Sequence, residues 1–530
     1  MRILKDRLAF IEALICWTVT TVVGVRIIID VIKWSGFVKW ASLGNTHLWQ
    51  GLGVFVIFHS TVCGLSFLYR RIFPQLSLVF IYLNLQLLFY LLFLIKGLIF
   101  VNLTDQSWWS IIFFFLVILR VILPGQKPEV GTFRKDIPLF GKTLIGIWFL
   151  SSVCLWIPQD WDINRKAFVD EGLFWVTAGQ EMIKQGIIAA HTAIYPGGWQ
   201  HPFGVPFMAA APMTWGVWRD PWAIYCWPLV IIFSLGLWLF SQRLGRWALL
   251  YFMAALLVVF GNEFWPSQLM YQLVYGESIG VILLLVFFSE IWRCLRLSTL
   301  FPATIFAISG AIGLLALTKA PGDLLVIPLE ATFLFLLFRY HRSMINGRIL
   351  FGSIAGSLFP LLIWRIFDQH FHVLAISTPG QFLDMIARIP HPNTALLSLA
   401  IKSMWGLNQN MVYVTCFSLV ILGAGDSRMR SLMAPVFVWV MAWLFYYAYI
   451  YHYHNAPGDY FSGLRYLMPT TLVLFWAAAS IYQDTIDQRL MKKRGVVYLL
   501  QCLPIIFIVM ILFFRKLYMF DAQGCPIAVF

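Results

Sequence analysis

Two adjacent carboxylates, Asp170 and Glu171, begin the longest polar interval of a chain otherwise made of long apolar runs. Neighbouring side chains at a helix start diverge by about 100°, so the two acids cannot share one role. One can act as a general base on a hydroxyl while the other orients a partner or holds a divalent cation. Spacing alone supports equally well a purely structural explanation, in which both acids favour a helix N-terminus.

Further side chains suited to an anionic substrate stand near the ends of other apolar runs. His201 precedes a proline at a loop-to-helix junction, where a helix cap is the plainer interpretation, and Glu277 begins a later run. Lys319 lies in a tight turn and is a natural counter-ion for a phosphate, unless it only snorkels to the interface. Arg465 and Tyr466 precede a late run, and arginine suits bidentate phosphate recognition.

The composition determines what must position these side chains. Apolar residues make up 60% of the 530 residues, charged residues only 12%, and the mean hydropathy is +0.80. A soluble protein with this ratio could not cover its core with polar surface. Continuous rather than alternating apolar runs exclude a β-barrel. We therefore predict an all-α polytopic membrane protein, in which the net charge of +14 reports topology and not nucleic-acid binding.

The apolar runs predict about fifteen transmembrane helices, since each can cross about 30 Å of hydrocarbon. Lysines and arginines cluster in alternate loops, which predicts a cytoplasmic N-terminus. The candidate residues above then all fall on the opposite, non-cytoplasmic face. The predicted spans begin near Phe10, Gly51, Ser77, Ser107, Leu144, Trp222, Trp247, Leu273, Phe301, Leu324, Leu350, Trp405, Leu432, Tyr466 and Val496.

The first long outer loop, residues 158–221, is predicted to carry two juxtamembrane helices. Residues 170–185 place apolar side chains on one side and Glu181, Lys184 and Gln185 on the other, as in a helix that lies flat at the interface. Residues 202–215 are apolar but too short to span, which fits a second interfacial or re-entrant helix. We expect this loop to present the active site.

Four short motifs in this order resemble those of the GT-C superfamily of membrane glycosyltransferases, which use polyprenyl-phosphate-linked sugars. The nearer likeness is to the branch of protein O-mannosyltransferases and aminoarabinose transferases. Phe203 stands where this branch usually has a second proline. The motifs are Asp170-Glu171-Gly172, the segment from Tyr195-Pro196 to His201-Pro202, Thr318-Lys319-Ala320-Pro321, and Leu464-Arg465-Tyr466-Leu467-Met468-Pro469.

The resemblance covers roughly residues 144–514 and implies a catalytic core there. Residues 1–143, about four spans, would be an N-terminal extension of unassigned role, and residues 515–530 a short non-cytoplasmic tail. It implies a multi-pass protein, expected in a bacterial inner membrane, with its active site on the periplasmic or outer face.

By resemblance, the reaction is an inverting transfer from a polyprenyl-phosphate sugar donor to a hydroxyl of a lipid, glycan or protein acceptor. Asp170 would be the base, and Glu171 would position the acceptor or a metal. Lys319 and Arg465, with Arg165 as a further candidate, would neutralise the phosphate leaving group. His201, Tyr195 and Tyr466 complete the predicted substrate-binding set. A divalent metal stays open, with Glu277 as its candidate ligand.

Two other functions compete with this interpretation. A lipid-linked glycan polymerase or ligase would show the same features. A lipid or sugar transporter (a flippase) would suit the many spans, but its acids are expected at mid-membrane depth, and no paired repeats with broken helices stand out in the sequence. A purely structural subunit would leave the ionisable set on the outer face without a purpose.

Overall fold

The computed structural model describes about half of the chain. The chain comprises two compact units, residues 37–239 with 273–383, and residues 1–36 with 240–272 and 384–530. The residues described are 46–70, 72–122, 178–179, 181–193, 202–215, 226–241, 243–245, 247–252, 255, 277–297, 299–318, 322–371, 409–423, 425–439, 470–484, 517–520 and 526–529.

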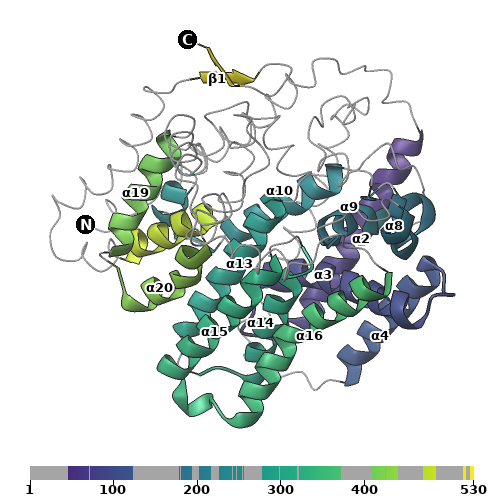
Figure 1. The fold of residues 1–530 in the computed structure, drawn as a ribbon, viewed down its shortest axis with the longest axis horizontal. Helices are drawn as coiled ribbons and strands as arrows, with labels where there is room; N and C mark the ends of the chain where they lie inside the picture. The colour runs from purple at the N-terminus through teal and green to yellow at the C-terminus, as the bar shows by residue number, and fades with distance from the viewer. Residues whose placement is uncertain are drawn as a thin grey trace, which may run out of the picture. The chain divides into compact units, whose positions relative to one another are not determined.

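The first unit is built from helices, as the composition predicts (Figure 1). They are α2 (Thr46–Tyr69), α3 (Leu78–Ile99), α4 (Asp105–Ile122), α8 (Ile187–Ala193), α9 (Gly204–Trp215), α10 (Cys226–Ser241, whose last two residues fall in the second unit), α13 (Glu277–Leu295), α14 (Pro302–Leu315), α15 (Gly322–Tyr340), the short 3-10 helix η2 (Arg342–Met344) and α16 (Gly347–Phe371).

Helix α3 is the central helix of this unit. Ser77 caps its N-terminus, where the side chain accepts from the Phe80 amide. The helix is apolar around its whole circumference, and most of its residues are buried, including Lys96. A helix that is hydrophobic on every side must be enclosed by protein or lipid. Here the partners are α2, α4, α8, α9, α13, α14 and α16.

Helix α16 is also apolar, but unlike α3 it has many exposed apolar side chains. It is 25 residues long, yet Phe351 is 76% and Leu362 56% exposed. A contiguous exposed apolar face marks a protein or membrane contact. Among the described residues, α3 and α16 are the helices both long and apolar enough to cross a membrane.

Every predicted span that falls on described residues coincides with a helix. The predicted starts at Ser77, Phe301 and Leu350 lie within three residues of the observed starts of α3, α14 and α16. The predicted starts near Phe10, Leu144 and Val496 lie outside the described residues, as does the predicted domain boundary at 143. The count of fifteen spans therefore stays a prediction. Packing of α3 against α13, α14 and α16 nevertheless joins the predicted extension to the predicted core.

The described parts of the outer loop agree in part with the two predicted juxtamembrane helices. Residues 181–185 are helical, with Met182 and Ile183 buried and Lys184 exposed, as the amphipathic pattern predicts. The predicted helix over 202–215 is α9, and its residues from Gly204 to Thr214 are buried among other helices. The intervening helix α8 is not among the predicted juxtamembrane helices, because its seven residues are too few to show a helical period.

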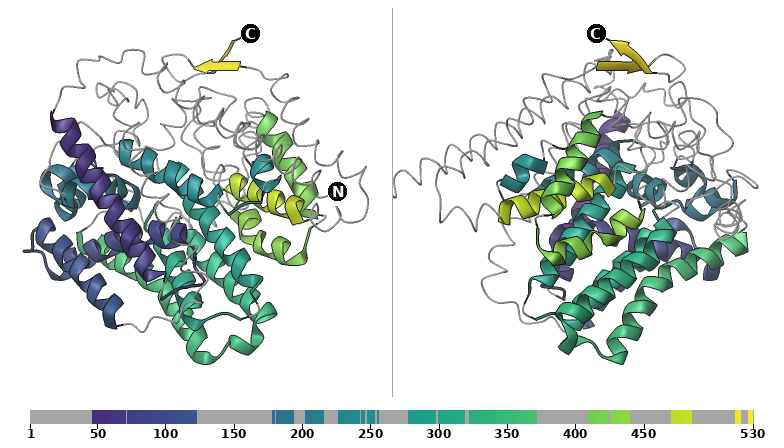
Figure 2. Two further views of the ribbon diagram at one scale, coloured as in Figure 1. Left: turned by 180° about the vertical axis from the view of Figure 1, so that it is seen from behind. Right: turned by 60° about the vertical axis from the view of Figure 1, so that its left-hand side comes forward.

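The second unit includes α19 (Gln409–Gly423), α20 (Ser427–Leu432) and a helical stretch at 470–484. Gln483 joins two of its segments, because its side-chain oxygen accepts from the amides of Trp247, at 2.9 Å, and Ala248, at 3.2 Å. Near the C-terminus, β1 (Leu517–Phe520) pairs antiparallel with β2 (Pro526–Val529) (Figure 2). This hairpin departs from the all-α prediction, which the other described elements confirm.

Candidate functional site

The predicted catalytic and substrate-binding residues lie outside the part of the chain that the structure describes. Glu277 is the first residue of α13, and its side chain is not described, so the predicted metal ligand stays a prediction. What the structure does describe are the flanks of the predicted site. The residues outside the description are Arg165, Asp170, Glu171, Tyr195, His201, Lys319, Arg465 and Tyr466.

The two described pieces of the outer loop, residues 181–193 and 202–215, are both attached to α3 and α4. At the first attachment, Asp105 at the start of α4 accepts from the Ile187 amide at 2.7 Å through Oδ2. Its other oxygen, Oδ1, accepts from the Lys96 ammonium at 2.5 Å. Both side chains are largely buried, at 15% and 5% exposed, so the pair acts as a charged anchor inside the bundle.

Gly186 allows this approach. Its φ of +103° lies in the region that only glycine adopts without strain, and it separates the helical residues 181–185 from α8. A Cβ there would lie 3.1 Å from the Asp105 Oδ2 atom. The glycine therefore serves two purposes, because it turns the chain and leaves room for the carboxylate.

The second attachment is a directional chain of hydrogen bonds through Tyr90. His191 Nδ1 lies 2.7 Å from the Ile187 carbonyl, and a carbonyl only accepts, so Nδ1 carries the hydrogen. Nε2 of the neutral ring must then accept from the Tyr90 hydroxyl, 3.0 Å away. The hydroxyl oxygen in turn accepts from the Phe203 amide at 3.0 Å. One tyrosine thus joins the two pieces of the loop.

Burial holds His191 in this neutral form. Desolvation lowers the pKa of His191 to about 3, although its bond to the Ile187 carbonyl opposes the shift. The ring also packs against Phe203, with centroids 4.5 Å apart, and against Phe367 at 5.1 Å. An enclosed neutral imidazole with both nitrogens engaged is a structural group, and it is poorly placed to exchange protons with a substrate.

Phe203 therefore has a structural role at the position where the sequence departs from the GT-C pattern. It is fully buried and both its ring and its amide contact the His191–Tyr90 pair. A proline there would lack the amide that donates to Tyr90. The departure from the family motif thus accompanies a hydrogen bond that proline could not make.

A backbone contact joins the outer loop to the turn that carries the Thr-Lys motif. The Gly204 amide donates to the Leu317 carbonyl at 3.0 Å. A Cβ on residue 204 would lie 2.2 Å from that oxygen, so only glycine permits the approach. Thr318, the first residue of the motif, is buried and its hydroxyl donates to the Leu315 carbonyl at 2.7 Å.

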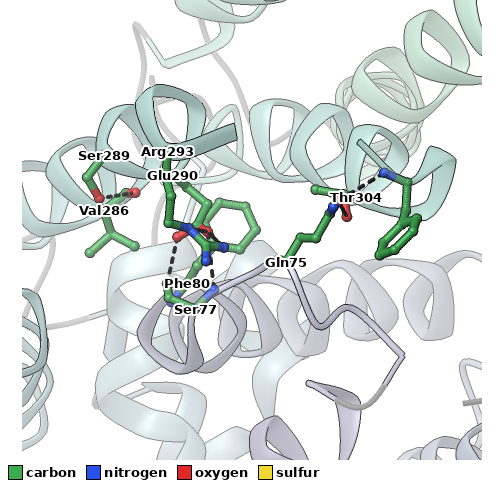
Figure 3. Close-up of polar contacts among 9 residues, drawn as sticks. Gln75, Ser77, Phe80, Val286, Ser289, Glu290, Arg293 and Thr304 are labelled. Atoms are coloured by element: carbon green, nitrogen blue, oxygen red, sulfur yellow. Dashed lines mark hydrogen bonds and ion pairs between the residues drawn. The ribbon is translucent and has the colours of Figure 1, made fainter. Parts of the chain in front are cut away.

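At the other end of α3, a polar cluster ties the segment before this helix to α13 and α14 (Figure 3). Glu290 is fully buried; its Oε1 accepts from the Ser77 amide at 3.2 Å and its Oε2 from the Ser77 hydroxyl at 2.7 Å. Arg293 donates to the same carboxylate through Nε at 3.0 Å and through a second nitrogen. Gln75 accepts from the Phe301 amide at 2.9 Å.

Sequence reasoning missed these attachments because it looked for ionisable residues in the outer loops. Lys96, Glu290 and Glu330 stand inside apolar runs, and an ionisable residue there is costly unless it has a partner or a function. That signal is present in the sequence. The long-range partners are not, since Ser77 and Glu290 are 213 residues apart and Asp105 and Ile187 are 82 residues apart.

No His, Cys, Asp and Glu group large enough for a metal site occurs among the described residues. No protein family, curated protein or solved structure matches the chain. The described part is thus a helical scaffold, with two helices able to span a membrane, that holds both flanks of the predicted loop.

Proposed function

We propose that this chain is an integral membrane glycosyltransferase that moves a sugar from a polyprenyl-phosphate donor to an acceptor hydroxyl on the non-cytoplasmic face. The support is the order of the four motifs, the helical scaffold, and the exposed apolar face of α16. That face, with Phe351 and Leu362 exposed, suits contact with lipid, where the polyprenyl chain of the donor would also reside.

The single observation that carries the proposal is the contact between the Gly204 amide and the Leu317 carbonyl. The two motifs are more than a hundred residues apart in sequence, and one enzyme site requires them to meet. His201 is three residues from Gly204 and Lys319 two residues from Leu317. Chain connectivity limits these separations to about 11 Å and about 8 Å, which supports the proposal of one site for the two predicted substrate-binding residues.

In the proposed reaction, the acceptor oxygen attacks the anomeric carbon as the bond from that carbon to the phosphate oxygen breaks. Asp170 takes the proton of the acceptor hydroxyl. Polyprenyl phosphate leaves with the bonding electron pair, and Lys319 and Arg465 stabilise the negative charge that grows on it. Glu171 positions the acceptor. A divalent cation, if one is bound near Glu277, would add positive charge to the same site.

The contacts of Asp105 and Tyr90 support a structural role for the N-terminal helices α3 and α4. Asp105 and Tyr90 hold α8 and the start of α9, so α3 and α4 support the loop that presents Asp170. An active-site loop gains precision when rigid elements hold it. We assign the N-terminal helices this supporting role instead of leaving them as an appendage.

The test is a transfer assay with the purified full chain and a panel of polyprenyl-phosphate sugars, after mass spectrometry of the lipid that co-purifies. Asp170→Asn should abolish transfer and leave expression and thermal stability unchanged. Glu181→Gln is the matched control: this acid lies in the same loop, bonds to Lys184 at 3.2 Å and to Gln185 at 2.5 Å, and has no proposed catalytic role. Its turnover should be close to wild type.

Turnover by Asp170→Asn at the wild-type rate would remove this residue from the mechanism. Translocation of the lipid-linked sugar across proteoliposomes, without any transfer, would identify a transporter instead. Extension of a lipid-linked glycan, in place of addition of one sugar, would identify a polymerase.

A further inference from the structure

Three helices of the first unit, α14, α15 and α16, lie side by side (Figures 1 and 2) and meet at a buried polar cluster. Glu330 Oε1 accepts from the Ser309 hydroxyl at 3.0 Å and from the Ser353 hydroxyl at 2.9 Å. The two hydroxyl oxygens also contact each other. Each helix supplies one member, and all three side chains are buried.

The cluster lies near the middle of α14 and α15. Glu330 is the ninth residue of the 19-residue α15 and Ser309 the eighth of the 14-residue α14, whereas Ser353 is the seventh of the 25-residue α16. Around Glu330, α14 and α16 approach closely through small residues, and a Cβ on Gly313 would lie 2.3 Å from the Ser357 carbonyl. Small residues at such an interface let two helix backbones come together. The hydroxyls of Ser309 and Ser353 are thereby held against the same carboxyl oxygen.

Among the described residues, Glu330 and Glu290 are the buried glutamates, and they differ because only Glu290 has a cationic partner there. Glu290 has Arg293 beside it, and both of its oxygens accept hydrogen bonds (Figure 3). Glu330 takes part in no ion pair among the described residues, and its Oε2 is buried without a hydrogen-bond partner there. A carboxylate in that setting would leave half of its charge unsolvated, which is strongly unfavourable.

The number of hydrogens leads to the same conclusion. Glu330 Oε1 and the two hydroxyl oxygens form three mutual contacts, but two serines supply only two hydrogens. One contact therefore lacks a hydrogen when the carboxylate is ionised. A proton on Oε1 provides the third hydrogen: Oε1 then donates to one serine, that serine donates to the other, and the second serine donates back to Oε1. The proton also removes the charge and leaves Oε2 as a carbonyl oxygen, whose unmet hydrogen-bonding need costs far less.

We propose that Glu330, Ser309 and Ser353 form a binding site for a single proton between α14, α15 and α16. Glu330 is a neutral carboxylic acid in the folded protein. Release of the proton would place an uncompensated charge between three packed helices, so protonation and the packing of α15 are coupled. Buried acids of this kind are the groups that take up and release protons in membrane proteins. The inference does not depend on the proposed transferase activity.

Among the described side chains, no other charged group forms an ion pair with this cluster. α14 carries none, Glu290 and Arg293 of α13 pair with each other, and Lys96 of α3 pairs with Asp105. His341, directly after α15, is buried. The other described titratable or charged side chains of α15, η2 and α16 are exposed or half-buried: Arg339, Tyr340, Arg342, Arg348, Arg365, Asp368 and His370.

The first test uses the unmodified full chain in detergent and a hydrophobic carbodiimide. The carboxylic O–H adds across one C=N bond of the reagent, with the proton passing to nitrogen, and the adduct rearranges to a stable acylurea without a leaving group. Mass spectrometry should find the adduct on Glu330 between pH 6 and 8 and none on Glu290, the matched buried carboxylate with an arginine partner. Protection of Glu330 by sodium ions would overturn the proposal, because a metal cation would then occupy the site.

The second test does not require the reagent to reach the site. Wild type and Glu330→Gln are unfolded reversibly in mixed detergent micelles between pH 6 and 8. If the folded protein keeps a proton that the unfolded chain releases, the unfolding constant of wild type relative to Glu330→Gln rises about tenfold for each pH unit. A ratio that stays flat over this range would overturn the proposal, whatever the labelling shows.

Discussion

Removal of the Tyr90 hydroxyl tests how the outer loop is held, because this one oxygen atom makes hydrogen bonds to both described pieces of the loop. The hydroxyl donates to His191 Nε2 and accepts from the Phe203 amide, each at 3.0 Å, and all three groups are buried. Tyr90→Phe keeps the ring and removes one oxygen atom. The variant leaves the imidazole nitrogen without its donor and takes this acceptor away from the amide.

Each buried polar group that loses its partner costs roughly 1–3 kcal/mol, so two groups give about 2–6 kcal/mol. The loss should appear first as local opening of the loop, because α3 itself keeps its other contacts. At the lower figure, the opening constant of α8 and of the start of α9 rises about 30-fold.

Amide hydrogen exchange of the peptides that cover residues 187–193 and 203–207 measures this opening directly. Tyr69→Phe is the matched control, since its hydroxyl donates to the Leu116 carbonyl of α4 at 2.9 Å. It should leave exchange in α8 unchanged. Wild-type exchange in Tyr90→Phe would refute the assignment of Tyr90 as the group that joins the two pieces.

The remaining predictions concern the other attachments of the same loop. Gly204→Ala should lower the free energy of unfolding by about 2–4 kcal/mol in thermal or detergent unfolding, from overpacking and a lost hydrogen bond. The reason is that its Cβ would lie 2.2 Å from a backbone oxygen. Gly280→Ala is the control: its Cβ would meet nothing within 4 Å, so this variant should be neutral or slightly stabilising. Asp105→Asn should cost about 3–5 kcal/mol by leaving the Lys96 charge uncompensated. The paired change of Lys96→Met with Asp105→Asn should recover most of it, because the Asn oxygen can still accept from the Ile187 amide; no recovery would show that the charge is not the cause. Because burial lowers the pKa of His191 from 6.5 to about 3, its contribution to stability is complete above pH 6.5 and falls as the pH drops toward 3, by about 2 kcal/mol at pH 5. The opening constant of the loop, obtained from hydrogen exchange after correction for the intrinsic pH dependence of amide exchange, should rise accordingly; a constant that is equal at pH 7 and pH 5 would contradict the neutral assignment.

Helix positions could be predicted from sequence because the apolar runs that form α3, α14 and α16 are continuous and bounded. In an apolar environment, each such segment must satisfy its backbone N–H and C=O groups by hydrogen bonds within the helix. The start of each apolar run therefore determines the start of the helix. The same reasoning failed for α8, whose seven residues are too few to show a period. Its fold depends on Asp105 and Tyr90, which come from other helices.

Composition and the lengths of the apolar runs are properties of the chain alone, and they establish a helical protein with runs of membrane-spanning length. The sequence also places chemically capable residues, Asp170 and Lys319 among them, in loops that share one predicted face. Some partners of the buried charges are near in sequence, since Arg293 is three residues from Glu290 and Asp105 is nine residues from Lys96. The fold alone shows the remaining partners: Ser77 bonds to Glu290, Ile187 bonds to Asp105, and Glu330 has two serines and no cation among the described residues. A buried charge is stabilised by groups that lie close in space, and packing between helices determines which of these groups come from elsewhere in the chain.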